Sequence, residues 1–125
     1  MAHENINISE AELEVMKVIW KEKKPVTSLD IGEAFETKGW KKTTIGTFLT
    51  RLVEKGALSA KKQGKLYYYT PLISQKDYRK SQTKNLILSL YGGSIKDFAV
   101  SLFEEQSISD EELKELRAIF VDKEE

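Results

Sequence analysis

The chain has 125 residues, enough for one domain or a small domain with an appendage. Its formal net charge is zero, and its 32% charged and 40% hydrophobic side chains are ordinary for a globular protein. It contains no cysteine and a single histidine, so disulfides, thiolate metal sites and histidine-based triads lack their residues. We therefore expect no enzyme, no metal and no cofactor. With no long apolar run and no signal-peptide pattern, the sequence predicts a cytoplasmic protein that makes no membrane contact.

The charges are unevenly distributed along the chain. Between Glu36 and Leu66 eight basic residues stand against two glutamates, whereas from Ser74 to the end eight basic residues stand against eleven acids. A basic segment joined to a mildly acidic one predicts that only part of the chain meets a polyanion.

Five hydroxyl residues mark the expected helix starts. Each is followed three residues later by an acid, so the hydroxyl can accept a backbone N–H of the first turn while the acid reaches back to the cap. Asp in the last position makes a weaker version of this capping box. The five pairs are Ser9 and Glu12, Thr27 and Asp30, Ser74 and Asp77, Ser94 and Asp97, and Ser109 and Glu112.

Three helices are expected in the first half, over residues 10–21, 28–37 and 43–55. The first is apolar over most of its circumference, which predicts burial on several sides. The third carries one apolar stripe at helical spacing: Ile45, Phe48, Leu49, Leu52 and Val53. Its opposite face is small, polar and basic: Thr43, Thr47, Thr50 and Arg51.

Two short alternating segments follow, over residues 58–62 and 66–70, with Gln63 and Gly64 as the turn between them. They predict a β-hairpin whose tip carries Lys61, Lys62 and Lys65. We interpret the adjacent tyrosines as packing groups of the hairpin rather than base-stacking groups: Tyr67, Tyr68 and Tyr69.

The remainder is expected to be helical, over residues 75–91, 95–104 and 110–121. The predicted fold is mainly α with a small β-hairpin: a winged helix-turn-helix DNA-binding domain (residues 1–73) and a C-terminal helical dimerisation domain (residues 74–125). Three helices followed by a basic hairpin is the element order of a winged helix.

This order favours binding to double-stranded DNA. A helix fits the major groove, small polar side chains let its backbone approach, and lysines at its start and on the hairpin can reach phosphates. The expected DNA-binding residues are Lys41, Lys42, Thr43, Thr44, Thr47, Thr50, Arg51, Lys62 and Lys65. A Thr-rich face and a lysine-bearing hairpin can each also be plain solvated surface.

The C-terminal helices carry apolar stripes that so short a segment can hardly bury by itself. A second copy of the chain is the expected partner, although the helices could also pack on the winged helix. The predicted homodimer interface consists of Leu86, Leu90, Ile95, Phe98, Leu102, Phe103, Leu113, Leu116 and Phe120.

The chain resembles the penicillinase repressor (BlaI/MecI) family over nearly its whole length. The matching stretches are ISEAELEVMKVIW, TTIGTFLTRLVEKGAL, KKQGKLYYYTPL and the tail YGG with ISDEELKELRAI. The resemblance implies a homodimeric repressor of antibiotic-resistance or related genes on a palindromic operator. In antibiotic-responsive members a membrane sensor protease triggers cleavage of the repressor. The bond aligned with their Asn-Phe cleavage bond is here Ser101–Leu102.

Some positions depart from the family pattern. Lys41 and Lys42 open the third helix where Ser-Pro is common, and Gly46 stands where some members carry a large or basic residue. The copper-sensing branch uses cysteines, which this chain lacks. Two other functions stay open: a winged helix that binds only protein, and a DNA-binding protein whose tail senses a small molecule.

Overall fold

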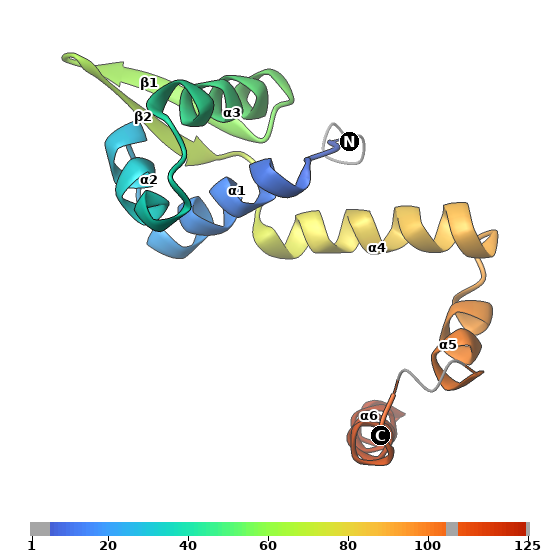
Figure 1. Cartoon of the computed structure of the whole chain (residues 1–125). Coiled ribbons are helices and arrows are strands. Elements are labelled where there is room, and N and C mark those ends of the chain that lie inside the picture. Colours follow the sequence, from blue (N-terminus) through green and yellow to red (C-terminus); the bar gives the residue numbers. More distant parts are fainter. Residues whose placement is uncertain (1–5, 105–107, 125) are drawn as a thin grey trace. The chain divides into compact units, whose positions relative to one another are not determined.

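The structure of the protein, a computed structural model, describes residues 6–104 and 108–124, of which residues 120–124 are described by backbone alone (Figure 1). The chain forms two compact units that divide between Ser81 and Gln82. The first unit holds three helices, a short 3-10 turn, a hairpin and the start of a fourth helix, and the elements that the structure describes in the second unit are helices.

The first two helices begin with complete capping boxes. α1 (Glu10–Glu22) starts at Ser9, whose hydroxyl accepts the N–H of Glu12 at 3.2 Å. α2 (Ser28–Ala34) starts at Thr27, whose hydroxyl accepts the N–H of Asp30 at 3.2 Å. In both, the acid in turn accepts the N–H of the cap residue, so both predicted starts are confirmed.

The predicted end of the second helix is wrong. α2 stops at Ala34, because Phe35 leaves helical geometry to place its ring in the core, and a 3-10 turn, η2 (Glu36–Lys38), follows. Gly39 then adopts the left-handed conformation, with φ of 68°, which glycine tolerates without strain. The chain thereby turns into α3 (Lys42–Glu54).

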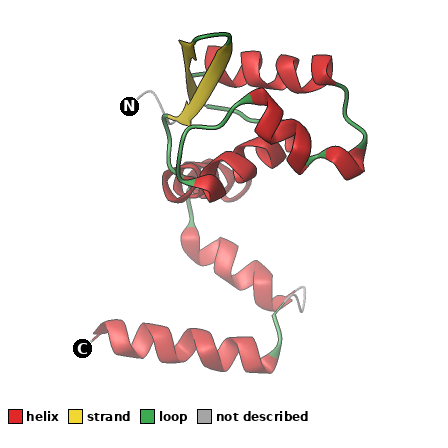
Figure 2. Cartoon of the chain, turned by 90° about the vertical axis from the view of Figure 1, so that its left-hand side faces the viewer, coloured by secondary structure: helices red, strands yellow, loops and turns green. Residues whose placement is uncertain are grey.

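The hairpin consists of β1 (Leu58–Gln63) and β2 (Leu66–Pro71), which pair antiparallel (Figure 2). Its turn residues are Gly64 and Lys65 rather than the predicted Gln63 and Gly64. Gly64 has φ of 64°, so glycine at the first turn position sets the register one residue later than expected. Val26 forms an isolated antiparallel bridge with Tyr69, through N–O distances of 3.1 and 2.7 Å.

One hydrophobic core joins the helices and the hairpin of the first unit. Its fully buried members come from α1, α2, α3 and β1 and include Met16, Ile19, Ile31, Leu49, Leu52 and Leu58. Each such side chain contributes about 1.5–3 kcal/mol by leaving water. Trp40 stacks on Phe35 and meets Phe48 edge-on, with ring centroids 4.6 and 5.2 Å away. These contacts fix the start of α3 on the body of the unit.

α1 ends at Lys23 with φ of 56°, the single positive φ among the non-glycine residues that the structure describes. A side chain in this conformation is strained by crowding between its Cβ and the following carbonyl. We expect Lys23→Gly to raise the free energy of unfolding by about 0.5–1 kcal/mol, measured by urea denaturation. Lys24→Gly, at ordinary φ, should lower it instead, and equal effects of the two changes would contradict this explanation.

Three further helices complete the chain: α4 (Gln75–Tyr91), α5 (Ile95–Glu104) and α6 (Asp110–Glu124). The hydroxyls of Ser74, Ser94 and Ser109 each accept a backbone N–H three residues on, at 3.0, 3.1 and 3.2 Å, so these starts are also confirmed. Gly92 and Gly93 follow α4 with positive φ, as its predicted end requires.

The first compact unit includes the first turns of α4. Tyr78 is buried against Trp20, with ring centroids 6.0 Å apart, and the indole N–H of Trp20 donates to the carbonyl of Ile73 at 2.9 Å. The functional division into residues 1–73 and 74–125 stays a prediction.

In the described ranges no single helix is long and apolar enough to span a membrane. Among the described helices, only the bent pair of α4 and α5, taken together, has the length and the apolar composition of a membrane-spanning segment.

Candidate nucleic-acid interface

Helix α3 presents two chemically distinct faces. Ile45, Leu49 and Leu52 are buried in the core, which fixes the rotation of the helix about its axis. The residues expected to meet DNA lie on the opposite side and are exposed, except that Thr44, on the flank, is half-buried: Thr43, Thr44, Thr47, Thr50 and Arg51. The side-chain hydroxyl of Thr47 donates to the carbonyl of Thr43 at 2.9 Å.

The start of α3 is electrostatically unusual. Its N-cap residue, Lys41, makes no side-chain cap, and its first turn contains no acid. Lys41 and Lys42 are both exposed there. Basic residues beside the positive end of a helix dipole lower the stability of that helix, whereas an anion at the same place would raise it. Uncapped N–H groups and two lysines together favour a phosphate.

Gly46 lies on this helix as its fifth residue of thirteen. A glycine inside a helix costs about 0.8–1.0 kcal/mol relative to alanine. A Cβ built at Gly46 would meet no atom within 4 Å, so packing does not require glycine here.

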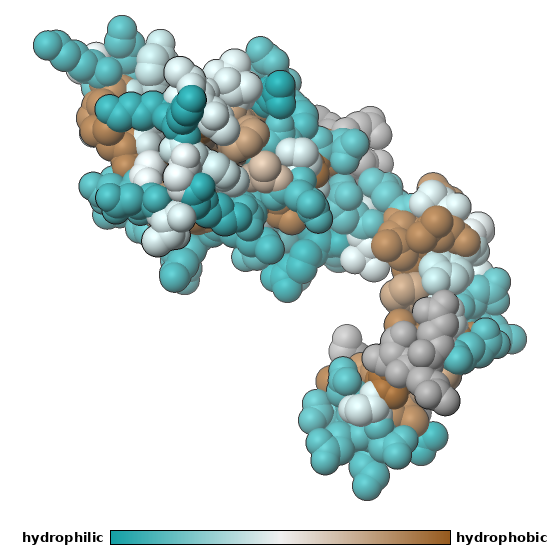
Figure 3. Space-filling view, in the orientation of Figure 1, coloured by the Kyte–Doolittle hydropathy of each residue, from teal (hydrophilic) through white to brown (hydrophobic). Residues whose placement is uncertain are grey.

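The hairpin tip is basic and projects as a hydrophilic surface (Figure 3). Lys61, Lys62 and Lys65 are exposed on it, so the lysines expected to reach DNA stand clear of the core. The tip carries no acid among residues 58–71. It can therefore approach a polyanion without repulsion from its own strands.

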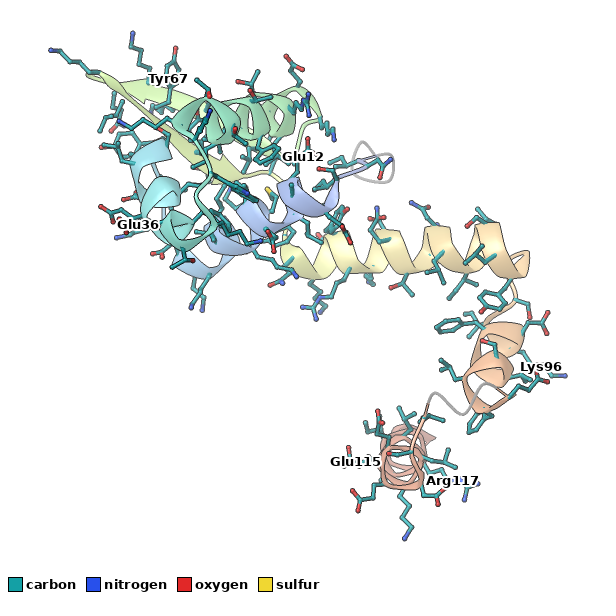
Figure 4. The ribbon with its side chains drawn as sticks, viewed as in Figure 1. Glu12, Glu36, Tyr67, Lys96, Glu115 and Arg117 are labelled. Carbon is teal, nitrogen blue, oxygen red and sulfur yellow. The ribbon has the colours of Figure 1, made fainter. Side chains whose placement is uncertain are left out.

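The hairpin tyrosines, interpreted from the sequence as packing groups of the hairpin, differ in their surroundings. Tyr69 is half-buried against the core, and burial, followed by the nearby Tyr67, raises the pKa of its hydroxyl. Tyr67 lies on the hairpin, where Figure 4 labels it, and is 50% exposed. The Nζ of Lys62, its cross-strand partner, lies 5.9 Å from the centroid of its ring. Alternation along the strand did not reveal this difference, because the hairpin runs beyond the core at Tyr67.

A groove of about 580 Å³ opens between α2 and the start of α3. Leu29 is 53% exposed at this groove, where Lys41 and Lys42 also lie. Glu33 and Glu36 line it as well, so its charge is mixed. No sequence pattern predicts this groove, because its walls come from two helices.

An ion pair between a buried glutamate and a partly exposed lysine holds the end of α3 against α1. The Oε1 of Glu12 lies 2.5 Å from the Nζ of Lys55, and the glutamate side chain is 2% exposed. Burial alone would raise the pKa of Glu12, but hydrogen bonds from Lys55 and Ser9, with the charge of Lys55, bring it below its usual value. Figure 4 shows Glu12 on α1, on the side where α3 lies. Sequence spacing does not predict a pair between residues 43 positions apart.

The second unit exposes much of its apolar surface, which Figure 3 shows around the end of α4 and α5. Leu90 and Ile95 are 69% and 70% exposed. Of the other predicted interface residues, three are exposed: Leu86, Phe103 and Leu116. Three more are half-buried: Phe98, Leu102 and Leu113. The side chain of Phe120 lies outside the described residues.

The Ser101–Leu102 bond lies inside α5. The hydroxyl of Ser101 donates to the carbonyl of Phe98 at 2.6 Å and is hydrogen-bonded to the hydroxyl of Tyr91 at 3.0 Å. Tyr91 also meets the Phe98 ring edge-on, with centroids 5.5 Å apart. Within the described ranges no three His, Cys, Asp or Glu residues gather as metal ligands would.

Three helices, a basic hairpin and a polar exposed face on the third helix define a winged-helix DNA-binding regulator. The sequence profile of the penicillinase repressor family matches residues 8–122. The chain therefore belongs to the penicillinase repressor family, as its resemblance implied, and its members are transcriptional repressors rather than enzymes.

Individual relatives agree with this assignment. The penicillinase repressor of Bacillus licheniformis is 40% identical over 112 residues, covering 90% of this chain and 88% of that protein. The methicillin resistance regulatory protein MecI of Staphylococcus aureus is 34% identical over 119 residues, covering 95% and 97%. Among solved structures, this chain matches the solution structure of the DNA-binding domain of the repressor BlaI with 46% sequence identity and a TM-score of 0.53. The match covers 58% of this chain and 89% of that one.

Proposed function

We propose that the protein represses transcription by occupying a palindromic operator as a homodimer. The observation that carries this proposal is the 46% identity between its winged-helix unit and the DNA-binding domain of a repressor. In that unit, α3 offers exposed threonines and an uncapped start with two lysines, which suits a helix that lies in the major groove. The relatives named for penicillinase and methicillin resistance make antibiotic-resistance or related genes the proposed targets.

The residues proposed to meet DNA divide into two groups. Thr43, Thr44, Thr47, Thr50 and Arg51 would face base edges and their flanking phosphates. The lysines would contact phosphates from the start of α3 and from the hairpin: Lys41, Lys42, Lys62 and Lys65. A protein with this role acts where the chromosome is, so we propose a cytoplasmic location.

The homodimer is proposed from the apolar surface of the second unit. Exposure of leucines and isoleucines on α4, α5 and α6 to water is unfavourable, and the free energy falls when another surface covers them. A second copy brings an identical surface, and a two-fold dimer places two winged helices on two half-sites. Two linked half-sites gain affinity from effective concentration.

Release from DNA is proposed to follow cleavage at Ser101–Leu102, triggered by a sensor protease. This bond lies within a helix and its serine is held by Phe98 and Tyr91, so α5 has to open locally before a protease can act. Cleavage there would divide the apolar side chains of α5 between two fragments and weaken the dimer.

The proposal is tested by selecting duplexes from random sequence with the full-length protein and measuring their affinity over a range of salt. We expect a palindromic duplex to be selected. Lys62→Ala and Lys65→Ala should each weaken specific and non-specific binding alike. Each should reduce the log–log salt slope by about 0.9 per lost phosphate contact, or about 1.8 for the two copies in a homodimer. Lys80→Ala, an exposed lysine of α4, is the matched control and should leave the slope unchanged.

A winged helix that binds only protein is the competing function. It predicts no selected duplex and the same weak salt dependence for wild type and both hairpin variants. A change of sequence preference in Lys62→Ala or Lys65→Ala would instead assign that lysine to base readout.

A further inference from the structure

The seven glycines of the chain fall into two classes. Five have positive φ and serve turns or helix ends: Gly39, Gly56, Gly64, Gly92 and Gly93. The other two, Gly32 and Gly46, lie inside helices without positive φ, and a Cβ built on either would meet no atom within 4 Å. Neither backbone conformation nor packing within the chain requires glycine at these two positions.

Gly32 and Gly46 differ in how much they destabilise their helices relative to alanine. Gly32 lies in the last turn of the seven-residue α2, just before the chain tightens into η2, where a helix gains least from alanine. Gly46 lies within the thirteen-residue α3, with helical turns on both sides, and carries the full cost of a helix-interior glycine. A residue that destabilises its own helix, and that neither backbone conformation nor packing within the chain requires, indicates a functional constraint.

The position of Gly46 identifies the side from which that constraint comes. Along α3 it lies one turn from the exposed Lys42, Thr43 and Thr50 and one turn from the buried Leu49, and Gly46 is itself half-buried between these two faces. Gly46 therefore leaves a notch on the flank of the exposed face, where the helix backbone itself is the surface. The floor of this notch is the Cα of the glycine, an apolar group.

We propose that Gly46 lets the DNA approach the backbone of α3 at this notch, and that the approaching group is an apolar C–H group of the DNA. This inference rests on the proposed function and deepens it. Thymine C5-methyl groups and deoxyribose carbons both have this chemistry. A Cβ at position 46 would hold the helix away from the duplex and loosen the neighbouring threonine contacts. Glycine is kept at the expense of fold stability.

The test compares Gly46→Ala with Gly32→Ala in the full-length protein. Gly46→Ala should raise the Tm by about 4–8 °C, because it removes the helix-interior glycine. It should also weaken binding to the duplex selected by wild type by about tenfold or more for each half-site, the effect of one lost base contact per protomer. Gly32→Ala should not weaken that binding.

Deoxyuridine, which lacks the 5-methyl group of thymine, distinguishes the two sources. If a thymine methyl fills the notch, one thymine-to-deoxyuridine change weakens wild-type binding and affects Gly46→Ala much less. If a deoxyribose carbon fills the notch, Gly46→Ala loses affinity by the same factor for selected and for random duplexes. Wild-type affinity of Gly46→Ala would overturn the proposal, as would an equal loss in Gly32→Ala. A wild-type protein that selects no duplex would overturn the proposed function and this inference with it.

Discussion

Replacing Leu116 with Asp should convert the protein to a monomer and weaken its binding to a two-half-site operator by about 10²–10⁴-fold. The range is the gain that effective concentration gives to two linked binding modules. Leu116 lies on α6 and is 37% exposed in the single chain. In the proposed homodimer each copy would bring one unpaired carboxylate into an apolar interface, where burial of a charge is strongly unfavourable.

The matched control is Ala118→Asp. Ala118 is exposed on the same helix but faces away from the side of Leu113 and Leu116, so this change adds the same charge outside the proposed interface. Sedimentation at micromolar concentration should give a monomer for Leu116→Asp and a dimer for wild type and Ala118→Asp. Binding of Leu116→Asp to a single half-site should equal that of wild type, because the winged helix stays folded. A wild-type monomer would refute the proposed assembly.

Helix starts were predictable from the sequence because they depend on contacts within four residues. Ser9 and Thr27 make the complete capping boxes that their sequences predict, and three further serines cap the C-terminal helices. The apolar stripe of α3 was predictable for a similar reason. Helical periodicity alone decides which side chains share a face, so the buried Ile45 and the exposed Thr47 lie on opposite sides.

Features that depend on distant residues were not predictable. The exposure of Tyr67 depends on how far the core reaches under the strand. The hairpin register is a separate case, because it follows locally from the positive φ of Gly64 at the first turn position. The end of α2 depends on the packing of Phe35. The burial of the interface residues is harder still to predict, because the surface that would cover Leu90 or Ile95 is proposed to belong to another chain.

The pair between Glu12 and Lys55 is the largest such omission, and it leads to a second strong prediction. Lys55→Met should lower the free energy of unfolding by about 2–3 kcal/mol at pH 7, measured by urea denaturation. Loss of one partner of a buried ion pair costs about 3–5 kcal/mol, and we reduce this because Lys55 is 34% exposed. The loss arises because Glu12, at 2% exposure, stays buried without its cation.

Glu12→Gln separates this charge effect from the helix cap. Glutamine keeps an oxygen that can accept the N–H of Ser9, as Glu12 does at 3.0 Å, and leaves no buried charge. Lys55 can then turn to water. We expect Glu12→Gln to cost less than Lys55→Met, and the double variant to be more stable than Lys55→Met alone. Additive losses in the double variant would contradict a coupled pair.

The pH dependence of these variants shows whether ionisation of Glu12 stabilises or destabilises the fold. In wild type the folded-state pKa of Glu12 is lowered, so its ionisation stabilises the fold above about pH 4.3, the unfolded value, and this contribution is lost as the pH falls through the folded pKa. In Lys55→Met burial remains without the cation, so we expect the folded pKa to rise above the unfolded one. Such a carboxyl destabilises the fold increasingly as the pH rises from the unfolded to the folded pKa. The stability gap between Lys55→Met and the double variant should therefore be widest at pH 7 and close toward pH 4, where glutamic acid and glutamine are both neutral. A gap that stayed constant between pH 4 and pH 7 would mean that packing of the lysine stem, not charge, is what Lys55 contributes.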